Sequence, residues 1–232
     1  MNLEDPALAG LQPIDNETLG KRVYNELRNF LMVGGVQPGE KLTLRQLTTA
    51  FGTSLMPVRE AVHRLAAEGA LEVLPNRAIR VPKMSRARFD ELVKLRVMLE
   101  GLAVATASTR MKPHDIEHLE ETNEGFIAEM RKPPESQQPF LLNKEFHFTI
   151  YRAAEMPVLL GMIENMWLQF GPFLHFSMGV KGRMATNKFA PESHRRMIQS
   201  MKRRDGEIGR KALEDDILGA VELILQFGDI PA

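Results

Sequence analysis

The apolar positions between Leu42 and Val81 predict two helices joined by a tight turn and followed by two short strands. In the second helix, Val58, Val62 and Leu65 fall at i, i+4 and i+7, which places them in one buried stripe. Arg59 then lies on a different face of the same helix. Two helices, a turn and a strand pair in this order are typical of a winged helix-turn-helix, a module that binds DNA.

The ends of these two helices carry residues suited to cap them. Gln46 follows Thr43 at the spacing of a capping box, and Gly52 is suited to end the first helix. Thr53 and Ser54 come next, and their hydroxyls can cap the start of the second helix. The turn between the two helices is therefore expected to be short.

The predicted strands, 71–74 and 79–81, flank a four-residue turn that forms the wing. Asn76 can adopt the left-handed conformation of a tight turn. Arg77 places a positive charge at the tip of the wing.

Upstream of this module, 19–33 has the period of an amphipathic helix. Its apolar side carries Val23, Leu27 and either Phe30 or Leu31. Residues 1–18 contain prolines and a glycine and show no sustained period, which predicts a flexible arm. We therefore expect the winged helix-turn-helix domain to span 19–82.

After Pro82 the apolar period becomes helical and stays so, while prolines interrupt it at intervals. We expect a second domain, 83–232, built as an all-α antiparallel six-helix bundle that is long enough to enclose a cavity. The expected helices are 86–111, 114–131, 139–154, 157–178, 190–203 and 206–227. The side chains whose spacing suits packing inside the bundle are Met98, Met162, Met166, Trp167 and Phe170. The predicted fold class is thus mainly α.

The composition excludes several classes of protein. The chain has 232 residues, of which 44% are hydrophobic and 26% charged, enough to form a core in each of two domains. It has no cysteine, which excludes disulfides and thiolate metal sites. No apolar run reaches membrane-spanning length, and the first ten residues lack the features of a signal peptide. We expect a cytoplasmic protein with no membrane partner.

The charge is balanced over the chain but not within the first domain. The whole sequence has 30 basic and 30 acidic residues, whereas 20–82 has nine basic and five acidic ones. A local excess of positive charge is what a phosphate-facing surface needs, because neutralising phosphates releases counterions. The alternative is that these side chains are ordinary solvated helix faces.

The first domain fits the pattern of a known family, in order, at Pro38, Gly39, Leu42, Leu47, Gly52, Ser54, Pro57, Val58, Arg59, Glu60, Ala61, Leu65, Glu68 and Gly69. On these residues it resembles the amino-terminal domain of GntR-type bacterial transcription regulators. Members often carry Arg directly after the Ser, where this chain has Leu55. One phosphate or base contact is therefore expected to be missing or replaced by neighbouring backbone amides.

The residue positions indicate roles in binding double-stranded DNA. Arg59 lies in the helix turns that enter the major groove, where its guanidinium can pair with guanine. The family resemblance implies a DNA contact for Arg45, and Arg77 is expected to reach a phosphate or the minor groove. Thr53 and Ser54 can donate to a phosphate, although helix capping alone would also explain them.

The second domain resembles the FCD effector domain of the FadR-like branch of the same family. The matching pairs and positions are Leu95-Arg96, Leu99-Glu100, Phe146-His147, Ala153-Ala154, Pro157 and Ser193-His194. The resemblance implies a homodimer that binds an inverted-repeat operator. It also implies a small organic-acid effector that releases a repressor from DNA.

Many FCD domains bind a divalent metal through Asp and His four residues apart and one His on each of two later helices. The resemblance places Asn143, His147, His194 and Asp216 at these positions. One carboxylate is kept but an imidazole nitrogen becomes an oxygen, which favours harder or more variable ions over tight Zn or Ni binding. The candidate ions are Zn, Ni or Mn. The alternative is a hydrogen-bonded core histidine at His147 and a helix-start residue at His194.

Arg96 lies mid-helix among leucines, where a cation facing the interior requires an anionic partner. In one interpretation it pairs with Glu100, four residues later, on a solvent face. In the other, Arg96 and the metal together hold the carboxylate of the effector.

Three functions follow from these patterns. We favour a metabolite-responsive DNA-binding regulator, most simply a repressor, over a metal-dependent enzyme in the bundle or a ligand-free architectural DNA protein. The pair His114 and His118 has the spacing of a metalloprotease motif, but Asp115 stands where that motif needs Glu. The sequence also shows no nucleophile with a paired base, which disfavours the enzyme.

Overall fold

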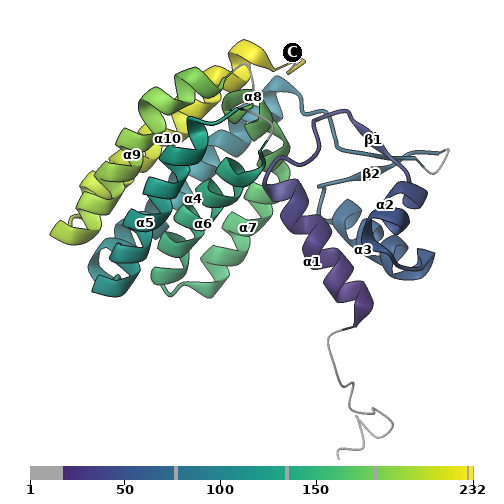
Figure 1. Cartoon of the computed structure of the whole chain (residues 1–232), viewed down its shortest axis with the longest axis horizontal. Coiled ribbons are helices and arrows are strands. Elements are labelled where there is room, and N and C mark those ends of the chain that lie inside the picture. Colours follow the sequence, from purple (N-terminus) through teal and green to yellow (C-terminus); the bar gives the residue numbers. More distant parts are fainter. Residues whose placement is uncertain (1–17, 76–77, 134–135, 180–181, 229, 232) are drawn as a thin grey trace, which may run out of the picture.

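The structure is a computed structural model of the chain that describes residues 18–75, 78–133, 136–179, 182–228 and 230–231. Its helices fall into two groups, and the long helix α1 (Leu19–Met32) lies between them (Figure 1). The predicted arm lies outside the described residues except for Thr18. The hydroxyl of Thr18 accepts a hydrogen bond from the backbone N–H of Lys21 and so caps α1.

The first group is a winged helix-turn-helix, as predicted. Besides α1 it contains helices and strands with the bounds α2 (Leu44–Phe51), α3 (Leu55–Ala67), β1 (Lys41–Leu42), β2 (Glu72–Val73) and β3 (Ile79–Arg80). The strands form an antiparallel sheet in the order β1-β3-β2, in which Arg80 lies opposite both Lys41 and Glu72. Strand β1 was not predicted, because two residues are too short to leave a period in the sequence.

The turn between α2 and α3 forms largely as the sequence indicates. Thr43 and Gln46 make both hydrogen bonds of the capping box, and Gly52 adopts a left-handed conformation with φ of 60°. Ser54 occupies the N-cap of α3, but its side chain makes no capping hydrogen bond. The expected capping role of Ser54 is therefore wrong, and its exposed hydroxyl is available for other partners.

The core of this group lies between α1 and α3. Val58, Val62 and Leu65 are buried on α3, as the period predicted, and α3 packs on α1. On α1, Leu31 is fully buried whereas Phe30 is 43% exposed, so Leu31 completes the apolar side. Burial of aliphatic side chains such as these stabilises a fold by about 1.5–3 kcal/mol each.

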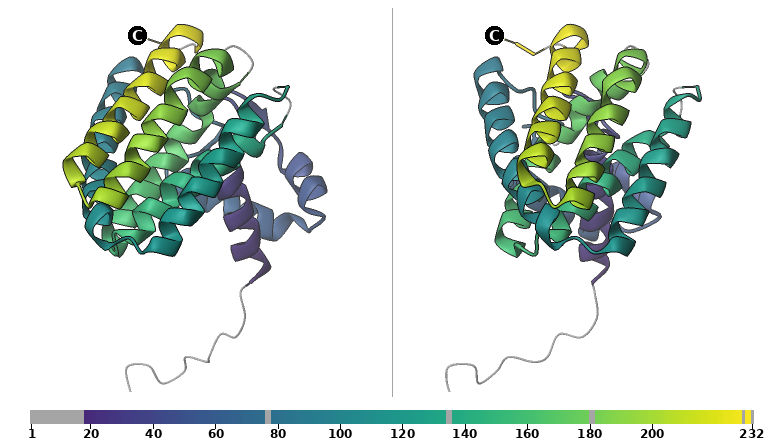
Figure 2. Two further views of the ribbon diagram at one scale, coloured as in Figure 1. Left: turned by 60° about the vertical axis from the view of Figure 1, so that its left-hand side comes forward. Right: turned by 90° about the vertical axis from the view of Figure 1, so that its left-hand side faces the viewer.

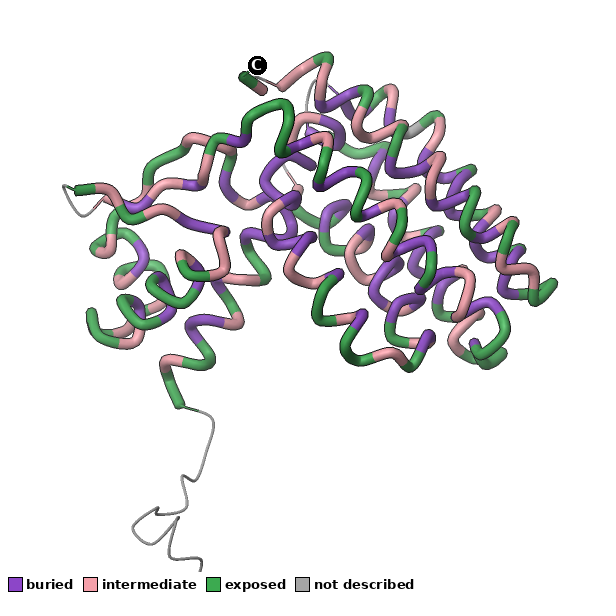
Figure 3. The backbone as a smooth tube through the Cα atoms, turned by 180° about the vertical axis from the view of Figure 1, so that it is seen from behind, coloured by how far each residue is buried: buried purple, intermediate pink, exposed green. Residues whose placement is uncertain are grey.

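The second group is a helical bundle whose long helices run side by side (Figure 2). It consists of α4 (Arg86–Arg110), α5 (Pro113–Met130), α6 (Gln138–Ala153), α7 (Pro157–Phe170), the 3₁₀ turn η1 (Gly171–Phe173), α8 (Leu174–Met178), α9 (Arg183–Arg203) and α10 (Gly206–Phe227). Buried positions line the sides of the helices that face each other (Figure 3). No helix of the described chain is long and apolar enough to cross a membrane.

The bundle departs from the predicted helices in two places. The expected helix 157–178 breaks after Phe170, because Pro172 has no N–H to donate and Gly171 favours helix poorly. Helix α9 begins at Arg183 rather than at 190 and contains Pro191 in its interior. Packing against α10 and α5 maintains α9 through that proline.

Two of the expected bundle-packing residues lie on the surface instead. Met98 and Met162 are 68% and 52% exposed, whereas Met166, Trp167 and Phe170 are buried as expected. Apolar residues of α4 and α7 thus also lie on the outward faces of these helices. The spacing of apolar residues does not show which face of a helix is buried.

The two groups are in direct contact through α1. Arg28 of α1 forms an ion pair of 3.1 Å with Glu164 of α7, and Lys144 of α6 donates to Asn29 of α1 at 2.7 Å. At the end of α1, the backbone carbonyls of Leu31 and Met32 lie so close to Gly171 of the bundle that a side chain at position 171 would not fit. Helix α3 is therefore connected to the bundle through the helix on which it packs.

Candidate metal centre and DNA-reading surface

Helix α3 presents its first turns to solvent. Arg59 is exposed there, and Arg45 is exposed on α2. Ser54 is exposed at the start of α3 and Thr53 is half-buried beside it. Arg77, predicted at the wing tip, lies outside the described residues. The exposed surface around the turn thus carries two of the predicted arginines.

An apolar pair on this surface was not predicted. Leu55 and Met56 occupy the first turn of α3 and are 49% and 59% exposed. In the sequence, Leu55 was notable only because family members often have arginine at this position. The reading end of α3 therefore combines the guanidinium of Arg59 with two exposed apolar side chains.

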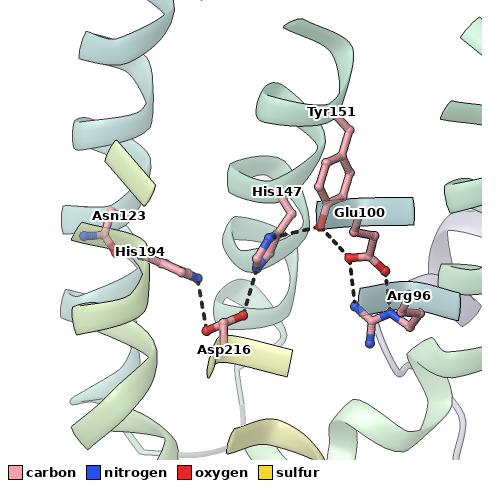
Figure 4. A network of polar contacts seen from close by, with 7 residues as sticks. All are labelled: Arg96, Glu100, Asn123, His147, Tyr151, His194 and Asp216. Carbon is pink, nitrogen blue, oxygen red and sulfur yellow. Dashed lines mark hydrogen bonds and ion pairs between the residues drawn. The ribbon is translucent and has the colours of Figure 1, made fainter. Parts of the chain in front are cut away.

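In the bundle, three of the four predicted metal ligands converge. His147 comes from α6, His194 from α9 and Asp216 from α10, and one ligand atom of each lies within 4.8 Å of the others (Figure 4). Nε2 of His147 is 3.3 Å from Oδ2 of Asp216, and Nε2 of His194 is 4.0 Å from Oδ1. A tetrahedral ion with ligand bonds of about 2.1 Å separates its ligand atoms by about 3.3–3.5 Å. Shifts of about an ångström would therefore close the site around an ion.

The fourth predicted ligand, Asn143, lies one turn before His147 on α6. It is buried and lines the same small cavity as Arg96, His147, Trp167 and Asp216. The cavity has a volume of about 30 Å³. Since one water needs about 10–15 Å³ measured in this way, the cavity fits an ion with one or two small ligand atoms.

The charges at the site are set by burial. Burial lowers the pKa of His194 from 6.5 to about 3, so the ring is neutral near pH 7. Burial works to raise the pKa of Asp216, but its contact with His147 and the proximity of His194 and Arg96 hold it below its ordinary value. The site therefore offers a neutral imidazole and a charged carboxylate.

The proton of His194 is fixed by Asn123, which the sequence did not indicate. Nδ1 of His194 lies 3.0 Å from Oδ1 of Asn123, an oxygen that can only accept, so Nδ1 carries the proton. Nε2 is then unprotonated, buried and without a hydrogen-bond partner among the described residues. Its lone pair faces the carboxylate of Asp216, an arrangement that a cation between them would stabilise. The residues present therefore fit a divalent metal.

Arg96 lies inside the bundle and is 5% exposed. Its Nε donates to Oε1 of Glu100 at 2.6 Å and its Nη2 donates to Oε2 at 3.2 Å. The predicted pairing is present, but the expectation of a solvent face is wrong, since Glu100 is fully buried. The guanidinium also stacks over the ring of Phe170 at 4.1 Å, which holds it in place.

Tyr151 joins this ion pair to the predicted metal ligands. Its hydroxyl lies 2.5 Å from Oε2 of Glu100 and 3.3 Å from Nδ1 of His147 (Figure 4). Burial raises the pKa of Tyr151 well above its ordinary value, so the hydroxyl keeps its proton. A helical period places Tyr151 on the His147 face, four residues later, but its partner Glu100 lies on another helix and could not be predicted.

The second histidine pair is not a site. His114 is exposed and contacts its neighbour Asp115, and His118 is 3.5 Å from Glu145 on the surface. Neither joins the buried cluster.

Comparison with known proteins identifies the family. Residues 19–81 match the bacterial regulatory proteins of the gntR family, and 91–218 match the FCD domain. This chain is a GntR-family regulator with an FCD domain. It is a DNA-binding transcription regulator and not an enzyme, so the metal-dependent enzyme considered above is ruled out.

Relatives align over nearly the whole chain. The HTH-type transcriptional regulator McbR of Escherichia coli (strain K12) is 29% identical over 219 residues, covering 94% of this chain and 98% of McbR. The solved structure of E. coli McbR has a TM-score of 0.84 at 30% identity and covers 91% of this chain and 99% of its own. The probable D-xylose utilization operon transcriptional repressor of Paenarthrobacter nicotinovorans is 27% identical over 197 residues, which is 82% of this chain and 84% of the relative.

Proposed function

We propose that this GntR-family regulator is a repressor that leaves its operator when a small carboxylate binds beside a metal in the FCD domain. The observation that carries this proposal is the buried cluster of His147, His194 and Asp216, of which His147 and Asp216 line the same cavity as Arg96. A ligand-free architectural protein would not need such a cluster, because burying polar groups in a helical core is costly. The protein would act in the cytoplasm, where its DNA target lies.

At the operator, α3 enters the major groove with Arg59 directed at a guanine. Leu55 and Met56 contact thymine methyl groups, since exposed apolar side chains at this end suit a methyl better than a polar edge. Ser54, Thr53, Arg45 and Arg77 contact phosphates. Replacing one contacted thymine by deoxyuracil, which removes only the methyl, should weaken binding by about 0.8 kcal/mol. Equal affinity at every such replacement would contradict this role for Leu55 and Met56.

In the bundle, Asn143, His147, His194 and Asp216 would hold the ion. Two imidazole nitrogens with carboxylate and amide oxygens suit Zn, Ni or Mn rather than a soft ion. When bound, the metal supplies a positive charge that attracts an anionic ligand. The domain 83–232 would thus bind the effector and form the dimer, while 19–82 would bind DNA.

Arg96 would hold the other end of the effector carboxylate. Its Nε and Nη2 bind Glu100, whereas Nη1 has no hydrogen-bond partner among the described residues. The indole N–H of Trp167, which lines the same cavity, is buried and equally unpaired there. Both donors match carboxylate oxygens. A metabolite larger than this cavity would have to displace its wall, formed by α8 and the start of α9.

The protein would act as a homodimer, because one reading helix recognises only a short half-site. Helix α4 carries exposed apolar residues along one side, with exposures of 41% at Leu95, 68% at Met98 and 46% at Leu102. A groove beside them is flanked on α10 by residues of both charges, which a two-fold axis can pair: Glu207, Arg210, Lys211 and Glu214. Met98→Glu should give a monomer in light scattering, whereas the exposed Met184→Glu should leave the dimer intact.

Trp167 offers a direct test of the effector site, because it is the only tryptophan in the chain. Zn²⁺ and then a panel of small carboxylates should change its fluorescence, and the same carboxylate should release the protein from an operator fragment. A carboxylate that releases DNA without changing Trp167 fluorescence would place the effector site elsewhere. If Zn²⁺ does not bind in any assay, the metal part of the proposal is wrong.

A further inference from the structure

The hydroxyl of Tyr151 lies between the carboxylate of Glu100 and the imidazole of His147, and it has one proton to donate. Oε2 of Glu100 lies 2.5 Å away and Nδ1 of His147 lies 3.3 Å away. A carboxylate accepts only, so the short contact requires that Tyr151 donate to Glu100. Glu100 is held in this position by the two hydrogen bonds from Arg96.

The direction of that proton decides what His147 can do. With its proton directed to Glu100, the hydroxyl of Tyr151 presents a lone pair to Nδ1 of His147, which must then carry a proton. The Nε2 atom, which faces Asp216, is left as the ligand atom. In metal sites, the hydrogen bond at the other ring nitrogen commonly fixes the tautomer and orientation of a ligating histidine.

We propose that Tyr151 is a positioning residue of the metal centre, which fixes the proton of His147 on Nδ1 and connects the metal to Arg96 through Glu100. The inference rests on the metal site of the proposed function. It adds a specific origin for the tautomer of His147, parallel to Asn123 at His194. Both imidazoles then direct Nε2 towards Asp216, and both are oriented by uncharged side chains.

The same geometry predicts what removing the hydroxyl does. Without Tyr151 Oη, the best remaining acceptor for a proton on His147 is the carboxylate of Asp216, 3.3 Å from Nε2. The proton would move to Nε2, the atom that the metal needs, and an incoming ion would have to displace it. Tyr151→Phe keeps the ring and its packing against Phe148 and Trp167, so the variant isolates the hydroxyl.

The experiment compares wild type, Tyr151→Phe and Tyr24→Phe, each stripped of metal with a chelator. Tyr24 is the only other tyrosine; it also bonds a glutamate, Glu68, but lies in the DNA-reading domain. Zn²⁺ affinity, measured by competition with a chromophoric chelator, should fall by about 10- to 100-fold in Tyr151→Phe. It should be unchanged in Tyr24→Phe. An unchanged affinity in Tyr151→Phe would overturn the proposal.

A second readout is independent of metal binding. In metal-free wild type labelled with ¹⁵N-histidine, the nitrogen shifts of His147, assigned with His147→Gln, should show a proton on Nδ1. In Tyr151→Phe that proton should appear on Nε2, a change that simple loosening of the fold would not produce. An unprotonated Nδ1 in wild type, or identical shifts in the two proteins, would overturn the proposal even if Tyr151→Phe folds poorly. If the nitrogen shifts are as expected but wild type does not bind Zn²⁺, the proposed metal function would be contradicted, whereas the positioning of His147 by Tyr151 would not.

Discussion

Gly171 of the bundle lies against the backbone carbonyl of Leu31 in α1. A Cβ atom at position 171 would be 2.5 Å from this oxygen and equally close to that of Met32, which no real Cβ tolerates. The absence of a side chain at Gly171 thus permits the contact between the helix that supports α3 and the domain that contains the cluster of His147, His194 and Asp216. Together with the ion pair of Arg28 and Glu164, it fixes how the two domains meet.

Gly171→Ala should therefore push α1 away from the bundle. We expect a loss of stability of about 1–3 kcal/mol, typical of overpacking, together with altered operator affinity. Thermal melts and DNA titrations measure the two effects. Gly161→Ala, on the exposed side of α7 with open space around it, should instead stabilise by about 0.5–1 kcal/mol. Equal effects of the two substitutions would show that the contact at Gly171 is not tight in solution.

Arg59→Ala should cost about 1–3 kcal/mol in operator binding and relax discrimination at one base position. The reason is the loss of a paired hydrogen bond to a base rather than a general loss of charge. Competition assays with single-base operator variants measure it. Arg203→Ala, which removes an exposed arginine from α9, is the control and should change neither affinity nor discrimination. If Arg59→Ala lowers the affinity for all DNA sequences equally, Arg59 contacts a phosphate and not a base.

Removing one metal ligand should abolish stoichiometric metal and leave the helices intact. Zn²⁺ at 100 times its dissociation constant should stabilise wild type by about 2.7 kcal/mol, because only the folded protein presents the site. His194→Gln should lose both the bound metal and this stabilisation, whereas the exposed His114→Gln should keep both. Metal content by elemental analysis and melts with and without Zn²⁺ provide the measurements. Full metal retention in His194→Gln would exclude His194 as a ligand.

The metal-free protein should lose stability in mild acid because of His194. Its folded pKa of about 3 lies below the unfolded value of 6.5, so the unfolded state binds a proton that the folded state does not. Stability is unaffected above pH 6.5 and falls by about 1.4 kcal/mol per pH unit between 6.5 and 3. Urea titrations from pH 7 to 5 should show this slope in wild type and a flatter one in His194→Gln. The same slope in both proteins would assign the acid sensitivity to other groups.

Arg96→Ala should lower the free energy of unfolding by far more than the loss of an ordinary i, i+4 ion pair would. Glu100 would be left buried without its cationic partner, at a cost of about 3–5 kcal/mol. Arg86 and Asp90 have the same spacing in the same helix but are half exposed, so Arg86→Ala should cost at most about 1 kcal/mol. Chemical denaturation of both variants makes the comparison. Similar small losses would mean that water reaches Glu100 in solution.

Local patterns determined much of this protein. The capping box at Thr43, the left-handed Gly52 and the stripe from Val58 to Leu65 specify the reading module, because each depends on residues only a few positions apart. The helical period after Pro82 likewise determined the class of the second domain. The break after Phe170 also has a local cause, the adjacent Gly171 and Pro172, whereas nothing local indicates that α9 continues through Pro191.

Only the tertiary structure decided which distant side chains share an environment. Asn143 and His147 are one turn apart, so the sequence alone places them on one face. The convergence of His147 with His194 and Asp216, the acceptor that Asn123 provides and the bridge from Tyr151 to Glu100 all join different helices. The burial of the Arg96 pair was decided in the same way. Spacing along one helix is fixed by its period, but contacts between helices depend on how their surfaces pack, and packing involves the whole bundle at once.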